Sequence, residues 1–211
     1  MPVSTAQLIE TIRVEPGRKI PLLAGHWRRL ASSCRALGYQ WPAGGLVDAV
    51  EQRVGELDAV GCYRLRLLLS QDGQYSIETY PLPDTLQPVR LHLSSVTLRA
   101  DHKWLAHKTT HRPWYEDAQR WLAANPEFFD VVYCNDKDEV CEGSRSNIYI
   151  QDAQGIWLTP PVACGLLPGV QRQALLDAAK VQEACISRRQ LLDARAIRVS
   201  NALRGWLDAR L

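Results

Sequence analysis

Strand and helix patterns alternate along this chain of 211 residues, and this alternation limits the folds open to it. Leu8–Val14 alternates apolar and polar side chains, as a strand with one buried face does. Two helical stripes follow at about 25–37 and 46–57, and then two strands at 63–69 and 75–80. No run of about 18 apolar residues is present, so a membrane span is not predicted. We predict a mixed α/β (α+β) fold.

The second half repeats the alternation with shorter strands. A polar stretch, Arg99–His107, separates the halves. We therefore predict a small N-terminal α/β domain at 1–98, a linker at 99–107 and a C-terminal domain at 108–211. Helices are predicted from Pro113, because proline suits a first helical turn, and at about 168–179 and 187–192. Strands are predicted at 89–98, 130–134, 139–141, 146–150, 156–159 and 196–200, the last being the final element.

The composition is that of a globular protein without a strong charge bias. Lys plus Arg total 25 and Asp plus Glu total 23, a formal net charge of +2. This balance argues against a dedicated nucleic-acid binder and against a polybasic membrane-surface protein. Neither a P-loop nor a GxGxxG motif is present to predict a nucleotide fold. We expect a small-molecule partner, with no nucleic acid and no membrane.

The six cysteines stand at positions 34, 62, 134, 141, 164 and 185, and none forms a CxxC pair. A zinc ribbon or thioredoxin-type site is therefore not predicted, and no metal ligand is assigned. The first thirteen residues contain acid and base and lack the apolar core of a secretory signal. We expect reduced, mostly buried thiols and a cytoplasmic protein.

Two residues are candidates for catalysis. Lys108 lies in the segment HKTTHR (107–112), and desolvation or neighbouring positive charge lowers the pKa of a lysine. A lysine with a lowered pKa is a nucleophile for carbonyls, including the aldehyde of pyridoxal phosphate. Glu142 ends a strand in a small-residue turn, from which a carboxylate can face a pyridinium nitrogen. Taken alone, the two patterns are more typical of a solvated lysine and a hairpin acid.

Three further segments offer donors to an anion. Residues 165–170 (GLLPGV) form a loop entering a helix, and helix N-termini bind phosphate. Arg29, in HWRRL (26–30), suits a phosphate dianion, whereas Arg28 is expected on the solvated helix face. Residues 199–205 end a strand with small polar side chains. Each segment also has an ordinary interpretation. Residues 165–170 would then be a plain helix N-terminus, Arg29 part of a solvated helix face, and residues 199–205 a turn.

The order of these segments resembles the fold-type IV (class IV) pyridoxal-phosphate enzymes. That family includes branched-chain and D-amino-acid aminotransferases and 4-amino-4-deoxychorismate lyases. The resemblance spans nearly the whole chain. The matching segments are ETIR (10–13), HWRRL (26–30), HKTT (107–110), EGSRSN (142–147), TPP (159–161), GLLPGVQR (165–172) and SNALRG (200–205).

The resemblance implies a two-domain fold-type IV architecture, with the cofactor in a cleft between a small and a larger domain, usually in a homodimer. Lys108 matches the lysine that bonds covalently to pyridoxal 5'-phosphate, and Glu142 matches the glutamate at the pyridine nitrogen. Arg29 matches the arginine that binds the cofactor phosphate. The remaining phosphate-side matches are Val170 and Gln171 at the helix start and Asn201 and Ala202 in the last turn.

Two positions depart from the family pattern. His111 stands where many members carry asparagine. Tyr115 lies further from Lys108 than the cofactor-contacting tyrosine of the branched-chain aminotransferases, so it is not among the predicted cofactor ligands. The chain is also short for the family, which suggests trimmed substrate loops.

Within the family, HKTTHR and Asn201-Ala202-Leu203 look most like the aminodeoxychorismate lyases. The implied reaction removes pyruvate from 4-amino-4-deoxychorismate and leaves 4-aminobenzoate, a folate precursor. From charge and position alone, Arg99 and Arg112 are predicted to hold substrate carboxylates. The alternative is a class IV aminotransferase acting on branched-chain or D-amino acids, which shares every cofactor residue.

Overall fold

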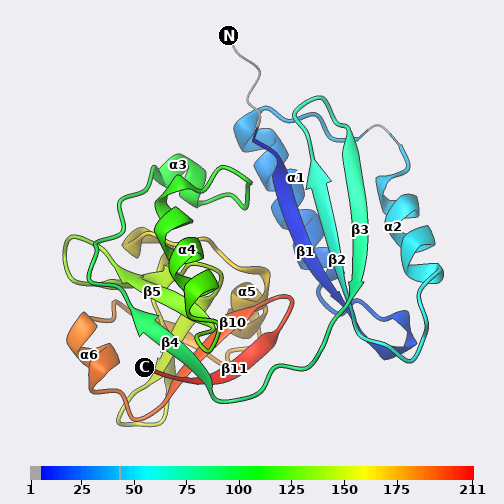
Figure 1. Cartoon of the computed structure of the whole chain (residues 1–211). Coiled ribbons are helices and arrows are strands. Elements are labelled where there is room, and N and C mark those ends of the chain that lie inside the picture. The colour runs from blue at the N-terminus through cyan, green and yellow to red at the C-terminus, as the bar shows by residue number, and fades with distance from the viewer. Residues whose placement is uncertain (1–5, 43) are drawn as a thin grey trace. The chain divides into compact units, whose positions relative to one another are not determined.

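The computed structural model describes residues 6–42 and 44–211, and it divides the chain into two compact units (Figure 1). Unit 1 contains the chain up to Asp84 together with His107–His111. Unit 2 contains Thr85–Ala106 and Arg112–Leu211. Within the described residues, none of the helices has the length and apolar character needed to cross a bilayer.

Unit 1 is built on a three-stranded antiparallel sheet in the order β1-β2-β3. The alternation of β1 directs Leu8 and Ile12 into the same core as the leucines of β2, and two helices pack against that core. Gly38 ends the first helix in the left-handed conformation, as expected for a glycine after a helix. The elements are β1 (Leu8–Val14), η1 (Pro16–Arg18), α1 (Leu23–Leu37), α2 (Leu46–Gly55), β2 (Tyr63–Leu69) and β3 (Tyr75–Pro81).

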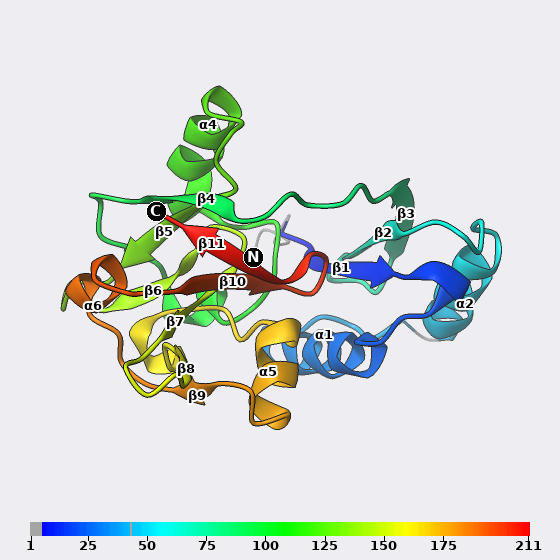
Figure 2. The ribbon, with the colours of Figure 1, turned by 90° about the horizontal axis from the view of Figure 1, so that it is seen from below.

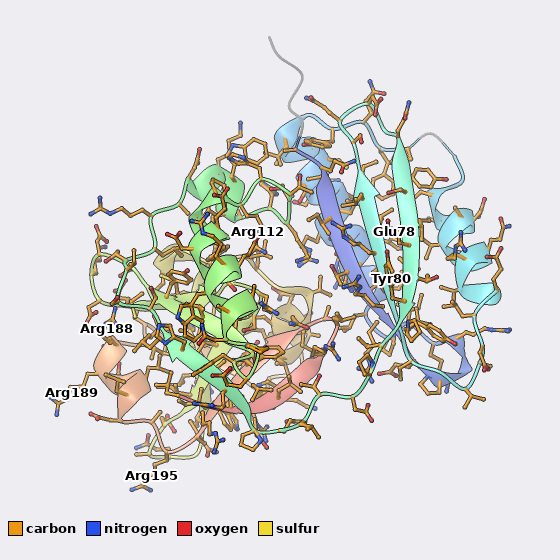
Figure 3. The ribbon with its side chains drawn as sticks, viewed as in Figure 1. Glu78, Tyr80, Arg112, Arg188, Arg189 and Arg195 are labelled. Carbon is orange, nitrogen blue, oxygen red and sulfur yellow. The ribbon has the colours of Figure 1, made fainter. Side chains whose placement is uncertain are left out.

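The opposite side-chain set of this sheet is largely polar, apart from the paired Ile9 and Leu68, because the other half of each alternation carries mainly charged and hydroxyl groups. Arg66 of β2 lies 3.5 Å from Glu78 of β3, and the Arg64 guanidinium lies 4.7 Å from the centre of the Tyr80 ring. Glu78 and Tyr80 are labelled on β3 in Figure 3. These exposed contacts contribute little to stability, whereas the leucines beneath them form the core.

Unit 2 is built on an eight-stranded mixed sheet in the order β6-β5-β4-β11-β10-β7-β8-β9. Figure 2 shows helix α4 and helix α5 on opposite sides of the central strands β10 and β11. The strands are β4 (Val89–Leu93), β5 (Asp130–Cys134), β6 (Val140–Gly143), β7 (Asn147–Gln151), β8 (Trp157–Thr159), β9 (Gln182–Glu183), β10 (Ile197–Asn201) and β11 (Gly205–Arg210). The helices are α3 (His102–Leu105), η2 (Pro113–Tyr115), α4 (Glu116–Ala124), η3 (Val162–Cys164), α5 (Val170–Asp177) and α6 (Arg188–Leu192).

The final strand was not predicted from the sequence. β11 follows β10 after the three-residue turn 202–204, and its first residue, Gly205, takes a φ of 79°. β11 also pairs in parallel with β4, whose residues lie more than a hundred positions earlier in the chain. A local pattern cannot reveal a partner so distant, so the prediction that a strand at 196–200 ends the fold was wrong.

The domain boundaries also differ from the predicted ones. β4 lies inside the unit 2 sheet, between β5 and β11, so the chain passes to unit 2 after residue 84 and not at 98. The predicted linker at 99–107 contains α3, whose Leu105 is buried in a unit 2 core. Residues 107–111 return to unit 1, because the Ile9 N–H donates to the Lys108 carbonyl and Leu8 pairs with Thr109.

Candidate active site

Glu142 is a fully buried carboxylate near the end of β6 in unit 2. The Tyr115 hydroxyl donates to its Oε1 atom at 2.7 Å, and the Leu167 N–H is a further donor. Burial raises the pKa of Glu142 to about 7, although Arg112 and the Tyr115 hydrogen bond both act to lower it. The contacts within unit 2 therefore offset burial only in part, and an added cation would favour the ionised carboxylate.

A second buried carboxylate, Asp130 of β5, fixes the turn that carries Glu142. It accepts hydrogen bonds from Ser144 Oγ at 2.7 Å and Ser146 Oγ at 2.5 Å, and from the Arg145 N–H at 3.1 Å. A Cβ atom on Gly143 would lie 2.1 Å from Asp130 Oδ2, so only glycine allows this approach. The small residues after Glu142 are therefore required by the Asp130 carboxylate.

Arg112 is a cation that acts on Glu142, and Figure 3 labels it just before η2. It donates to the Ser144 carbonyl at 2.8 Å, and its guanidinium lies 4.6 Å from the centre of the Tyr115 ring. It thus orders the Glu142 turn, a role that sequence reasoning did not assign to it. Arg99, the other predicted substrate ligand, is exposed in unit 2. The substrate roles of both arginines stay predictions.

Helix α5 begins at Val170, and no side chain caps its first turn. Its N-cap, Gly169, provides no side-chain hydrogen bond, and the first turn contains no acidic residue. Asn147 holds the approach to the helix by donating to the Leu167 carbonyl at 2.9 Å. A Cβ atom on Gly169 would lie 2.1 Å from Asn147 Oδ1. The predicted donors at Val170 and Gln171 therefore start an uncapped helix, as a phosphate-binding helix end requires.

Asn201 ends β10 and shapes the turn that follows. Its Nδ2 donates to the Arg145 carbonyl at 3.2 Å, and its Oδ1 accepts from the Arg204 N–H at 2.8 Å. The Glu142 turn, the start of α5 and the turn at Asn201 and Ala202 are thus linked by hydrogen bonds within unit 2. The contributions of Asn201 and Ala202 to a phosphate site stay predictions.

Lys108 lies in unit 1, on the segment that pairs with the start of β1. Its carbonyl accepts from the Ile9 N–H at 2.8 Å, and the Thr110 N–H donates to the Gln7 carbonyl at 2.8 Å. The neighbouring Thr109 is fully buried and donates to the His111 carbonyl at 3.0 Å. The Lys108 side chain is half-buried on a backbone held from both sides, and its covalent role stays a prediction.

Arg29 also lies in unit 1, where α1 places it against the buried Glu10 of β1. Its Nε and one terminal nitrogen donate to the Glu10 carboxylate at 2.9 and 2.5 Å, and His26 Nδ1 lies 2.6 Å from the same group. Burial acts to raise the pKa of Glu10, but the two partners outweigh it and hold the pKa at about 2. Arg28 is exposed, as predicted. The phosphate role of Arg29 stays a prediction, because its observed contacts are with Glu10.

Two residues of this arrangement were missed by sequence reasoning. Tyr115 was predicted to face inward from the helix that begins near Pro113, and the structure confirms this, but its hydrogen bond to Glu142 was not predicted. Asp130 was interpreted as an ordinary first strand residue, and only its burial and four donors mark it as an anchor. The serines around Arg145 were the one available signal, since clustered hydroxyls often serve a buried acceptor.

Residues 7–211 match the model of the family described as amino-transferase class IV. The chain therefore belongs to the class IV aminotransferase family, in agreement with the resemblance of its motifs.

Among its relatives is a curated protein of Schizosaccharomyces pombe named "Putative aminodeoxychorismate lyase". The two are 29% identical over 167 residues, which cover 77% of this chain and 70% of the relative. The crystal structure of a "Putative amino-acid aminotransferase" from Mesorhizobium loti has 31% identity and a TM-score of 0.87, covering 98% of this chain and 99% of that one. The PLP-bound form of a hypothetical aminotransferase from Mycobacterium tuberculosis shares the fold, with 23% identity, a TM-score of 0.75 and coverage of 96% and 80%.

Proposed function

We propose that this protein is a pyridoxal-phosphate-dependent enzyme, and the buried Glu142 is the observation that carries the proposal. Its pKa of about 7 means that the carboxyl group is poised to accept a cationic partner. A protonated pyridine nitrogen is such a partner. The uncapped start of α5 provides donors suited to a phosphate dianion. The residues of unit 2 therefore fit both charged groups of this cofactor, the protonated ring nitrogen and the phosphate.

When bound, pyridoxal phosphate draws electrons away from the Cα atom of an amino substrate. The chain's own groups have separate tasks. Ionised Glu142 holds the proton on the ring nitrogen, and Tyr115 and Arg112 hold Glu142. The N–H groups at Val170 and Gln171 would bind the phosphate, and Arg29 is the further proposed phosphate ligand. Lys108 Nζ would hold the cofactor covalently and would serve as the base for the Cα proton of the substrate.

We propose that the reaction is that of a 4-amino-4-deoxychorismate lyase, which releases pyruvate and 4-aminobenzoate for folate biosynthesis. The support is the HKTTHR segment, the Asn201-Ala202-Leu203 turn and the name of the S. pombe relative. The same proposal includes a cytoplasmic homodimer. Arg99 and Arg112 are the proposed ligands of the substrate carboxylates.

A class IV aminotransferase is the second candidate. The M. loti structure, which covers nearly the whole chain at the higher identity of 31%, carries an aminotransferase name. An aminotransferase leaves its cofactor in the amine form and needs a keto acid to restore it. A lyase regenerates the aldehyde form in every cycle and needs no acceptor.

This difference defines the experiment. The purified protein, loaded with pyridoxal phosphate, is given 4-amino-4-deoxychorismate without any keto acid, and 4-aminobenzoate and pyruvate are followed over many turnovers. Sustained release of both products supports the lyase. Absence of product, together with keto-acid-dependent conversion of branched-chain or D-amino acids, assigns the aminotransferase. Lys108→Ala is the control and should be inactive in both assays.

A further inference from the structure

A cluster of metal-ligating side chains lies in unit 2 outside the groups assigned above. The carboxylate of Glu139 and the sulfurs of Cys164 and Cys185 lie within 4.8 Å of one another. Glu139 precedes β6, Cys164 ends η3 and Cys185 follows β9, so three separate segments meet here. None of these residues has a task in the proposed reaction.

The spacing of the two sulfurs is that of a zinc site. Cys164 Sγ and Cys185 Sγ are 3.8 Å apart. A tetrahedral zinc ion with Zn–S bonds of about 2.3 Å places two bound sulfurs about 3.8 Å apart. A disulfide would instead require the two sulfurs to approach to about 2.05 Å. The observed geometry therefore needs no movement of the sulfurs to accept a metal ion.

The surrounding hydrogen bonds hold these segments in place. Asn135 Nδ2 donates to Glu139 Oε2 at 2.8 Å and lies 3.2 Å from the Cys164 carbonyl, so one side chain orients two of the three segments. Cys141 Sγ donates to the same carbonyl at 3.1 Å. The Val140 N–H donates to the Ile186 carbonyl at 2.7 Å, which fixes the third segment beside β6. Outer contacts of this kind orient the ligands of metal sites.

We propose that Glu139, Cys164 and Cys185 bind one thiophilic divalent cation, with zinc the best fit. Two sulfurs and one carboxylate form a donor set suited to zinc, and water completes the tetrahedron because Cys185 is exposed. Binding converts both thiols to thiolates and releases their two protons to solvent, with no change of oxidation state. The ion ties η3, which precedes α5, to the strand that carries Glu142, and so stabilises unit 2. This inference does not depend on the proposed reaction.

The test uses Co²⁺ as a spectroscopic probe, added to the full chain under a reductant that does not bind metal. Thiolate coordination in a tetrahedral site gives intense d–d bands at the red end of the visible spectrum, away from absorption by pyridoxal phosphate. We expect these bands to saturate at one equivalent and to disappear when Zn²⁺ displaces the cobalt. The same Zn²⁺ should raise the melting temperature of the wild-type chain.

Variants locate the site. Cys185→Ser changes an exposed residue and should abolish the bands while circular dichroism shows an intact fold. Loss of a residue that only orients a metal ligand typically weakens metal affinity by about 10–100-fold. Glu139 is itself a proposed ligand, so Glu139→Gln should weaken Zn²⁺ binding by no less than this. Cys62→Ser, in unit 1, is the matched control and should bind as the wild type does.

Absence of the bands in reduced wild type, or equal bands in Cys185→Ser, would overturn the proposal. So would a Cys164–Cys185 disulfide that persists in the presence of the reductant, seen as a mass two hydrogens below that of the dithiol chain.

Discussion

The Tyr115 hydroxyl donates a 2.7 Å hydrogen bond to Glu142 Oε1, and both side chains are buried in unit 2. This bond is one of the contacts that act to lower the pKa of Glu142 against the effect of burial. Tyr115 itself has a pKa well above 10, mainly because it is buried and then because Glu142 is close. It therefore stays protonated and remains a donor throughout the physiological pH range.

Replacing Tyr115 with phenylalanine should raise the pKa of Glu142 above its value of about 7. A hydrogen bond to a charged group contributes about 1.5–3 kcal/mol, which corresponds to about one to two pKa units. In the cofactor-loaded enzyme the protonated ring nitrogen would lower this pKa. The proposed reaction still needs ionised Glu142, so the acidic limb of the kcat profile should move to higher pH in the variant. Tyr133→Phe, in the same core, is the control, and an unshifted limb in Tyr115→Phe would disprove the coupling.

Glu142→Gln should stabilise the cofactor-free protein at alkaline pH. The pKa of Glu142 is raised from 4.5 to about 7 in the folded state, so its ionisation opposes folding as pH rises through this window. At pH 8 the variant should be more stable than the wild type by a few kcal/mol, and near pH 4.5 the two should be equal. Melting temperatures at both pH values provide the measurement. The exposed Glu127→Gln serves as the control, and a variant less stable at pH 8 would refute the assignment.

The same Glu142→Gln change should leave cofactor binding largely intact while reducing turnover severely. Glutamine keeps the size and the acceptor for Tyr115, but it cannot hold a proton on the ring nitrogen by charge. Cofactor affinity and kcat are measured side by side. Turnover near the wild-type rate would rule out the proposed pairing with the ring nitrogen.

Lys108 should carry the cofactor. Borohydride reduces the carbon–nitrogen double bond of a lysine-bound cofactor, so peptide mapping of the reduced holoenzyme should find the pyridoxyl group on Lys108. Label on Lys103 or Lys180 would contradict the assignment. Lys108→Ala should abolish turnover, because the nucleophile and the Cα base are lost together.

Arg29→Ala should destabilise the protein by about 3–5 kcal/mol, because it leaves the buried Glu10 charge with only one partner. The pKa of Glu10 is lowered to about 2, so its stabilising effect is fully present above pH 4.5 and is lost as the pH falls towards 2. The difference in stability between Arg29→Ala and the wild type should therefore become smaller as the pH falls towards 2. Arg28→Ala, on the exposed face, should change stability by no more than about 0.5 kcal/mol. Equal melting curves for the two variants would contradict this interpretation.

If Arg29 also binds the cofactor phosphate, Arg29→Ala should weaken cofactor affinity by about 1.5–3 kcal/mol, the contribution of a hydrogen bond to a charged group. Affinity is measured by titration at a temperature where the variant is fully folded. Unchanged affinity in a folded Arg29→Ala would confine this arginine to its structural role with Glu10.

Gly143→Ala should cost about 1–3 kcal/mol or more, since the added Cβ would meet Asp130 Oδ2 at 2.1 Å. Asp130 holds the turn that carries Glu142, so turnover should fall as well. Gly55→Ala is the matched control, because apart from its chain neighbours and the backbone of α2 itself no atom lies within 4 Å of its Cβ position. Thermal melts and kcat of both variants test this. A Gly143→Ala protein as stable as Gly55→Ala would show that the turn does not depend on Asp130.

The sequence by itself determined the elements of unit 1 and the family. Leu8–Val14, the two helical stripes and the hairpin of β2 and β3 follow from local periodicity and turn residues, and the structure confirms them. The family was identified because several short motifs occur in one order along the chain, and each motif can be recognised without knowing its spatial neighbours.

Only the tertiary structure decided which side chains meet. Tyr115 and Glu142 are 27 positions apart, and Asp130 and Ser144 are 14 apart, so the periodicity of a single element predicts neither pairing. The pairing of β11 with β4 and the approach of Cys164 to Cys185 depend in the same way on sheet order. Periodicity reports which face of an element is buried, because that depends on the element's own geometry. It does not report which other element covers that face, because packing between distant segments selects the partner.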